Sequence, residues 1–190
     1  MLNIVLFGPP GAGKGTQSEN IISKYKLTHL STGDLFRKHL GEGTDLGKLA
    51  RKYMDEGRLV PDEVVIGMVD DKIANTPGTN GFIFDGFPRT VAQAEALDKL
   101  MKKNNIEISG MIALDVEENI LKERIRERGK TSGRTDDQDE SKIETRIRVY
   151  LDETLPVAEY YEKQGKFTKI NGVGTIEGIF ADITKVIDQY

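Results

Sequence analysis

The chain has 190 residues and no cysteine, which excludes disulfides and thiolate metal sites. Its formal net charge of −4 argues against a general nucleic-acid binder, which would have an excess of basic residues. Hydrophobic residues make up 37% and charged residues 31% of the sequence, so we expect one soluble globular domain. No stretch has the pattern of a signal peptide or the apolar length of a membrane span, and we therefore expect a cytoplasmic protein without nucleic-acid or membrane partners.

Short apolar runs alternate with longer helical patterns, which favours an α/β fold with a parallel sheet. Strands are predicted at 2–7, 28–31, 81–85, 110–115 and 167–171. The main helices are predicted at 14–25, 61–74, 90–103, 117–128, 141–164 and 175–189. Pro61 suits the first position of its helix. Pro156 should kink or break the long helix that contains it.

Two stretches interrupt this alternation. Residues 32–59 have no strand pattern and predict two short helices, 33–40 and 45–56. Residues 127–137 are small, polar and turn-forming. Because loops on a doubly wound sheet usually carry the function, we expect both stretches to cover a ligand.

A glycine-rich segment, 8–16, lies between the first predicted strand and the first predicted helix. Its glycines allow backbone N–H groups to face an anion, the helix dipole favours negative charge at the same place, and Lys14 adds a full positive charge. This context predicts a phosphate-binding loop rather than a simple glycine-rich turn. Gly15 follows the lysine where the general motif has Ser or Thr, and Thr16 comes one place later, which leaves open whether a hydroxyl contacts Mg²⁺.

A second group of candidate residues follows predicted strands. Asp85 ends strand 81–85, and a turn at Gly86 and Pro88 aims Arg89 from the same edge. Ligands bind at this edge of open α/β sheets, and an acid near a phosphate-binding loop commonly organises Mg²⁺. A helix-capping role for Asp85 and a surface position for Arg89 are the alternatives, and we favour the functional interpretation. Thr32, taken alone, is better interpreted as a helix cap.

Arginines gather in the second half of the chain. Arg124 and Arg128 share a helix face, Arg134 lies in the polar loop, and Arg146 lies on the next helix. A helix rich in Glu and Arg can simply have a salt-bridged surface, and we interpret Arg126 in this way. The other four suit phosphoryl transfer, since the planar guanidinium matches phosphoryl oxygens.

Five stretches together resemble the adenylate kinase family over essentially the whole chain. They are 8–17, 30–34, 55–60, 84–90 and 132–137. The family carries a glycine after the lysine of its phosphate-binding loop. Gly15 therefore matches the family where it departs from the general motif.

The resemblance implies an α/β fold of the P-loop nucleoside triphosphate hydrolase type, with three layers and a five-stranded parallel sheet between helices. It divides the single kinase domain, 1–190, into a core (1–30, 61–126 and 138–190), a helical subdomain for the nucleoside monophosphate (31–60) and a short lid (127–137). Longer lids in the family can hold zinc. The brief lid and the lack of cysteine predict that this chain has no zinc site.

The resemblance also implies roles for individual residues. The ATP-binding residues are Gly11, Ala12, Gly13, Lys14, Gly15, Thr16, Arg128 and, through its backbone against the base, Gly174. The AMP-binding residues are Thr32, Arg37, Arg58, Leu59, Val60, Gly86, Phe87, Pro88, Arg89, Gln93, Arg134 and Arg146. The catalytic residues are Lys14, Arg89, Arg124, Arg128, Arg134 and Arg146, while Asp85 orients water on Mg²⁺.

The implied reaction is the reversible conversion of MgATP and AMP into two ADP, by direct transfer of the terminal phosphoryl group. This reaction keeps the adenine nucleotides in balance, and the resemblance implies that the enzyme is a monomer. Uridylate/cytidylate kinases are the alternative, but they tend to have alanine in place of Thr32 and they differ around Gln93. A glutamine amide can pair with an adenine edge through one donor and one acceptor. A nucleotide-dependent switch or a kinase of a non-nucleotide molecule would lack this acceptor site.

An open site would let water attack ATP, so the two covering segments should close only when both substrates are bound. Gly129 and Gly133 are expected to give the lid backbone freedom. Asp136 and Asp137 are expected to hold the closed lid to neighbouring basic groups.

Overall fold

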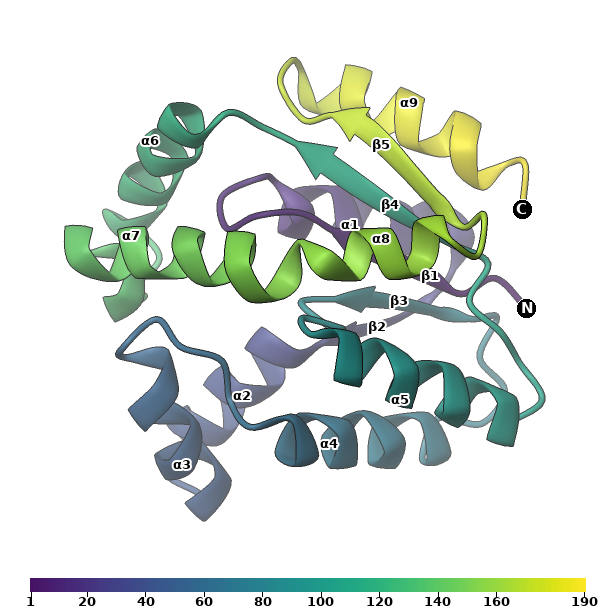
Figure 1. Ribbon diagram of the computed structural model, residues 1–190, viewed down its shortest axis with the longest axis horizontal. Helices are drawn as coiled ribbons and strands as arrows, with labels where there is room; N and C mark the ends of the chain where they lie inside the picture. Colours follow the sequence, from purple (N-terminus) through teal and green to yellow (C-terminus); the bar gives the residue numbers. More distant parts are fainter.

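The computed structural model describes residues 1–190 and contains a five-stranded sheet in the order β2-β3-β1-β4-β5 (Figure 1). Every neighbouring pair of strands is parallel, which confirms the predicted sheet. The strands are β1 (Ile4–Phe7), β2 (Thr28–Ser31), β3 (Phe82–Asp85), β4 (Gly110–Asp115) and β5 (Phe167–Asn171). Because the strands are parallel, the segments that follow β1 and β3 leave the sheet at the same edge.

Helices make the connections between strands. In chain order they are α1 (Lys14–Tyr25), α2 (Thr32–Gly41), α3 (Asp45–Met54), α4 (Asp62–Ala74), α5 (Val91–Lys103), α6 (Glu118–Gly129), α7 (Glu140–Val149), α8 (Pro156–Glu162) and α9 (Ile176–Ile187). None of these helices combines the length and the apolar character that crossing a membrane requires.

Alternate side chains of β1 enter two separate cores, which produces three layers. Val5 and Phe7 pack in the core that α4, α5 and α8 cover. Ile4 and Leu6 pack in the core that α1 and α9 cover. Figure 1 shows α8 in front of the sheet and α1 behind it. This arrangement confirms helices on both faces of the sheet.

The strands β1 and β3 begin later than predicted. At their start, the side chain of Asn3 makes hydrogen bonds in place of those between the two backbones. Asn3 is fully buried. Its Oδ1 accepts from the N–H of Phe82 at 3.0 Å, and its Nδ2 donates to the carbonyl of Glu107 at 2.8 Å. The amide therefore links the beginnings of β1 and β3 to the segment before β4 and satisfies buried backbone groups.

Both proline predictions bear on helix boundaries. Pro61 is the N-cap residue of α4 rather than its first helical residue, so that prediction was wrong by one position. The predicted helix 141–164 is divided into α7, a π-helical segment at Tyr150–Thr154 and α8. Pro156 opens α8, which confirms the predicted break, because proline has no N–H to continue the preceding helix. The π-helical segment was not predicted.

Candidate functional site

A cavity of about 720 Å³ opens at the carboxyl ends of β1 and β3. The glycine-rich loop after β1, the turn after β3, α2 and the arginines around α6 and α7 all contribute to its lining. Every predicted site residue except Ala12 and Gly174 lines this cavity. The structure thus brings together residues that lie up to 135 positions apart, from Gly11 to Arg146.

The glycine-rich loop has the tight backbone that its sequence predicts. Gly11 and Gly13 have φ values of 81° and 93°, which residues other than glycine rarely adopt. A Cβ on Gly11 would also lie 2.9 Å from the carbonyl oxygen of Leu121 in α6. Lys14 folds back over the loop, where its Nζ donates to the carbonyls of Gly8 and Pro9 at 2.9 and 3.0 Å. The loop therefore packs against α6 and keeps the ammonium at the cavity.

Positive charge is concentrated in the cavity. Desolvation lowers the pKa of Lys14 to about 8, although the charge of Asp85 opposes this change and Arg89 adds to it. Desolvation and the nearby Arg146 lower the pKa of Arg89 to about 10. Both side chains lose hydration and repel other cations, so a polyanion in the cavity would stabilise their charged forms.

Asp85 ends β3, and its side chain is 13% exposed. Its Oδ2 lies 3.6 Å from Nε2 of His29 on the neighbouring strand β2. Burial alone would raise the pKa of Asp85, but His29 and Lys14 outweigh burial and hold the pKa below its usual range. Asp85 is not a helix cap, because Thr90 caps α5. His29 was missed, although the pairing of two parallel strands could have placed it opposite this region.

The ionised carboxylate of Asp85 is suited to Mg²⁺, which prefers oxygen ligands. The chain has no group of three or more His, Asp or Glu residues that could hold a metal by themselves. Mg²⁺ commonly keeps several waters and is bound through one or two carboxylates together with substrate phosphates. A single carboxylate at the edge of a phosphate-binding cavity is compatible with that mode.

The turn after β3 is built around the carbonyl of Gly86. This oxygen accepts from Nε of Arg89 at 2.7 Å and from Oγ1 of Thr32 at 2.8 Å. The capping interpretation of Thr32 is wrong, because Ser31 caps α2 by accepting from the N–H of Asp34 at 3.2 Å. Thr32 instead ties α2 to the turn, and Arg89 reaches the cavity rather than the outer surface.

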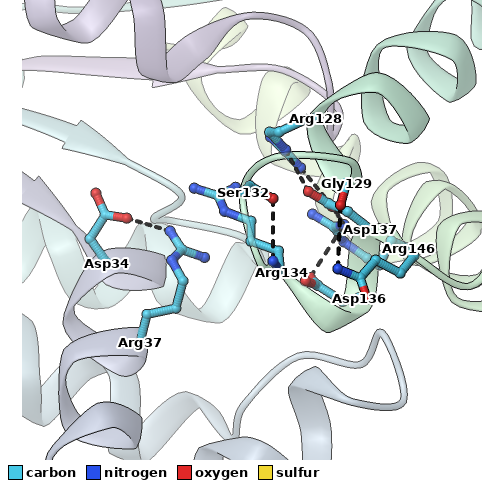
Figure 2. Close-up of polar contacts among 10 residues, drawn as sticks. Asp34, Arg37, Arg128, Gly129, Ser132, Arg134, Asp136, Asp137 and Arg146 are labelled. Atoms are coloured by element: carbon cyan, nitrogen blue, oxygen red, sulfur yellow. Dashed lines mark hydrogen bonds and ion pairs between the residues drawn. The ribbon is translucent and has the colours of Figure 1, made fainter.

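A buried carboxylate holds the residues 127–137 together with α6 and α7 (Figure 2). The side chain of Asp137 is fully buried and accepts from Nε and Nη2 of Arg128 at 2.6 and 2.8 Å. It also accepts from Nη1 of Arg146 at 2.7 Å, and Arg146 lies 3.2 Å from Asp136. We call Arg128, Asp136, Asp137 and Arg146 the lid cluster. Both aspartates therefore pair with neighbouring basic groups.

The lid cluster pairs two carboxylates with two guanidinium groups. Burial alone would raise the pKa of Asp137, but Arg128 and Arg146 outweigh burial and hold the pKa below its usual range. Gly129 permits the close approach, because a Cβ there would lie 2.6 Å from the carbonyl oxygen of Asp137. Gly129 also ends α6, so it serves close packing rather than the backbone freedom that we expected. Gly133, with a φ of 67°, does occupy a conformation that favours glycine.

Arg134 and Arg37 extend toward each other from the segment 127–137 and from α2 (Figure 2). Arg37 forms an ion pair with Asp34. The polar contact of Arg134 comes from its backbone N–H, which donates to Oγ of Ser132 at 3.2 Å, so the guanidinium remains available to a ligand. Desolvation and the charge of Arg37 lower the pKa of Arg134. An anion between the two guanidinium groups would relieve their repulsion.

Three other arginines have different surroundings. Arg124 donates to the carbonyls of Ala12 and Gly172 at 3.4 and 3.0 Å, and so links the glycine-rich loop to the segment after β5. Arg58 lies at the rim, where its side chain is 59% exposed and pairs with Glu56 at 2.8 Å. Arg126 pairs with Glu140 at the surface, which confirms its predicted role.

Gln93 is 1% exposed and makes contacts that the sequence did not predict. Its Oε1 accepts from the N–H of Arg89, and its Nε2 donates to Asp62. The spacing of Thr90 and Gln93 is that of a capping box, which was the available signal. Tyr150 and Thr154 of the π-helical segment also line the cavity, and no motif in the sequence indicated them.

Comparisons with known proteins agree on one family. The family model described as "Adenylate kinase" matches residues 6–166. The adenylate kinase of Flavobacterium johnsoniae is 54% identical over 189 residues, and the alignment covers 100% of both chains. That of Bacteroides fragilis is 50% identical over 188 residues, 99% of each chain. That of Syntrophobacter fumaroxidans is 42% identical over 212 aligned positions, which cover 98% of this chain and 100% of the relative.

Proposed function

The chain belongs to the adenylate kinase family, and from this premise we propose how its cavity performs the reaction. The enzyme is an ATP:AMP phosphotransferase, which moves the terminal phosphoryl group of ATP to AMP and produces two ADP. One observation carries the proposal. A single cavity joins the phosphate-binding loop of β1 to the Arg89 turn of β3, with arginines of the lid region around it.

The glycine-rich loop is the donor side of the cavity. We assign the phosphates of ATP to the backbone N–H groups between Gly11 and Thr16, at the positive end of α1. Lys14 then stabilises the transferred phosphoryl group, because its ammonium lies at the mouth of that loop. Arg124 and Arg128 face the donor from α6. Gly174 lies outside the cavity lining, so its proposed backbone contact with the base is not supported by the cavity.

The turn after β3, α2 and Gln93 form the acceptor side. Thr32 and Arg37 approach from α2, Arg89 from the turn, and the segment Arg58 to Val60 from the rim. The phosphate of AMP already presents an anionic oxygen, so no side chain has to act as a covalent nucleophile or as a base. Catalysis then depends on positioning and on stabilisation of charge.

Arg134 and Arg146 bridge the two sides. The guanidinium of Arg134 is available to a ligand, whereas Arg146 belongs to the lid cluster. Both arginines would bind the reacting phosphates, because negative charge develops on the equatorial oxygens of the phosphoryl group during transfer. Mg²⁺, when bound, neutralises part of the charge on the ATP phosphates, and Asp85 would hold it through water.

We further propose that residues 31–60 and 127–137 close over the substrates as a monophosphate-binding subdomain and a short lid. The lid cluster supports a lid that is stabilised by ion pairs rather than by zinc. We propose that the active form is a monomer. Sedimentation of the active enzyme tests that oligomeric state.

An acceptor panel tests the substrate assignment. AMP, UMP, CMP, dTMP and GMP are each supplied with MgATP, and formation of the nucleoside diphosphate is followed. We expect AMP to be used with the highest kcat/KM, because the amide of Gln93 can pair with adenine. Preferential use of UMP or CMP would contradict the proposed acceptor site.

A further inference from the structure

The amide of Gln93 is held at both ends by the protein. Its Oε1 accepts from the backbone N–H of Arg89 at 2.7 Å, and its Nε2 donates to Oδ1 of Asp62 at 2.8 Å. A backbone N–H can only donate and a carboxylate can only accept, so these partners fix which end of the amide is oxygen and which is nitrogen.

Asp62 lies behind the cavity rather than in its lining. It is the first residue of α4, and its Oδ1 also accepts from Oγ1 of Thr90 at 3.1 Å. Thr90 in turn caps α5 by accepting from the N–H of Gln93 at 3.2 Å. Gln93 itself lines the cavity. Asp62 can therefore influence a bound ligand only through the residues that it positions.

Each end of the Gln93 amide keeps one unused hydrogen-bonding function. A primary amide has two N–H donors and two acceptor lone pairs, and the protein uses one of each. The remaining donor and acceptor have a fixed polarity. This polarity suits a 6-aminopurine, which presents an acceptor at N1 and a donor at the 6-amino group. A 6-oxopurine presents the reverse, a donor at N1 and an acceptor at O6.

Reading a 6-oxopurine would require the amide to rotate by half a turn. Rotation would place Nε2 against the N–H of Arg89 and Oε1 against the carboxylate of Asp62. Both contacts would become repulsive in a site where Gln93 is 1% exposed and water cannot compensate.

We propose that Asp62 is a specificity-determining positioning residue, which locks the Gln93 amide in the orientation that selects 6-aminopurine over 6-oxopurine monophosphates. This inference rests on the proposed placement of the AMP base at Gln93. It assigns the choice between the two kinds of purine to Asp62, a residue outside the cavity that is hydrogen-bonded to the Gln93 amide.

The test compares kcat/KM for AMP and for IMP, whose base is the 6-oxo counterpart of adenine. In Asp62→Asn, the new amide can accept from or donate to Gln93, so rotation is no longer opposed at that end. We expect the ratio of kcat/KM for AMP to that for IMP to fall about tenfold. The matched control is Glu63→Gln, which removes the same charge from the same turn of α4 at an exposed position and should leave the ratio unchanged.

A second pair of variants separates this inference from the proposed function. Gln93→Leu removes the reading group itself and should lower the same ratio. If Gln93→Leu lowers the ratio but Asp62→Asn reduces the use of both nucleotides equally, Asp62 is only a structural link and the inference is wrong. If neither variant changes the ratio, the AMP site is wrong as well. Should Asp62→Asn fail to fold, Asp62→Ser, which still accepts from Thr90, must show the same fall in the ratio.

Discussion

Lys14 lies on the proposed donor side of the cavity, and its pKa is lower than that of an ordinary lysine. Desolvation lowers its pKa to about 8, while two loop carbonyls accept from its Nζ. In the proposed complex, phosphate oxygens would replace those carbonyls and restore full protonation. The residue therefore has a strong preference for an anion, which is the property that transfer of a phosphoryl group requires.

Replacing Lys14 tests its catalytic role. We expect Lys14→Met to lower kcat by about 100- to 1,000-fold, because a preorganised charge at the transferred group is lost. Steady-state kinetics measure the change, and circular dichroism checks that the fold is intact. Lys24→Met, at an exposed position of the same helix α1, is the control and should retain normal turnover. Near-normal kcat in Lys14→Met would remove Lys14 from the mechanism.

The lowered pKa of Lys14 also predicts a pH dependence of ATP binding. The group is charged below its pKa of about 8 and neutral above it, so affinity should be highest below pH 8 and should fall as pH rises further. Titration calorimetry with MgATP between pH 7 and 10 measures this trend. Lys14→Arg keeps its charge across that range and should flatten the profile. A wild-type affinity that stays constant up to pH 10 would refute the assignment.

Replacing Arg89 tests whether AMP and ATP bind on separate sides of the cavity. Its Nε donates to the Gly86 carbonyl, and its guanidinium lies on the proposed acceptor side. We expect Arg89→Ala to raise KM for AMP by at least tenfold while the Kd for ATP changes by less than about twofold, since a hydrogen bond to a charged group contributes about 1.5–3 kcal/mol. Arg126→Ala, in a surface ion pair, removes the same charge as a control. Equal losses for both nucleotides would contradict the placement of Arg89.

Among the elements, α6, the segment 127–137 (the proposed lid) and α7 form one unit because the lid cluster joins them. The three isoleucines Ile125, Ile143 and Ile147 pack between α6 and α7, and Asp137 links the arginines of both helices. A fully buried carboxylate is stable there only because two guanidinium groups bind it. The arginines that the reaction is proposed to use are thus positioned by an acid of the lid.

The lid cluster predicts a loss of stability when Asp137 is changed. We expect Asp137→Ala to lower the free energy of unfolding by about 2–4 kcal/mol at pH 7, because Arg128 and Arg146 lose a buried partner. Urea denaturation measures it. Glu140→Gln, in the exposed pair with Arg126, is the matched control and should cost about 0.5 kcal/mol or less.

The carboxylate of Asp137 also makes the difference in the free energy of unfolding between the wild type and Asp137→Ala depend on pH. The folded-state pKa of Asp137 is lowered, so its contribution is fully present above the unfolded pKa of about 4 and is lost as pH falls through the folded value. The difference between the wild type and Asp137→Ala should therefore shrink below pH 4. A difference that is the same at pH 7 and at pH 3 would show that the ion pairs do not cause it.

The sequence predicted the elements well because their signals are local. The apolar runs of the five strands and the glycine loop before α1 each lie within a few residues. One wrong prediction and one contact that was not predicted involve neighbours distant in the sequence. Thr32 is not a cap, because Gly86 offers it a carbonyl and Ser31 caps α2 instead. The link from Asp62 to Gln93 depends on how α4 and α5 pack, which no local pattern encodes.

At the scale of the whole molecule, the parallel sheet places two phosphate-binding groups at one edge. β1 leads into the proposed donor loop and its neighbour β3 leads into Asp85 and the proposed acceptor turn, while α2 and residues 127–137 approach from opposite sides. Each group alone would hold a nucleotide. Their shared cavity supports direct transfer between two nucleotides, with water kept out when the covering segments close.

The stoichiometry of the products tests this central claim most directly. Phosphorus NMR of the enzyme with MgATP and AMP should show both substrates consumed in equal amounts and two ADP formed for each ATP, without inorganic phosphate. Omitting AMP should leave ATP intact over the same time. Accumulation of inorganic phosphate together with ADP, at a rate independent of AMP, would contradict direct transfer and would identify the cavity as a hydrolytic site.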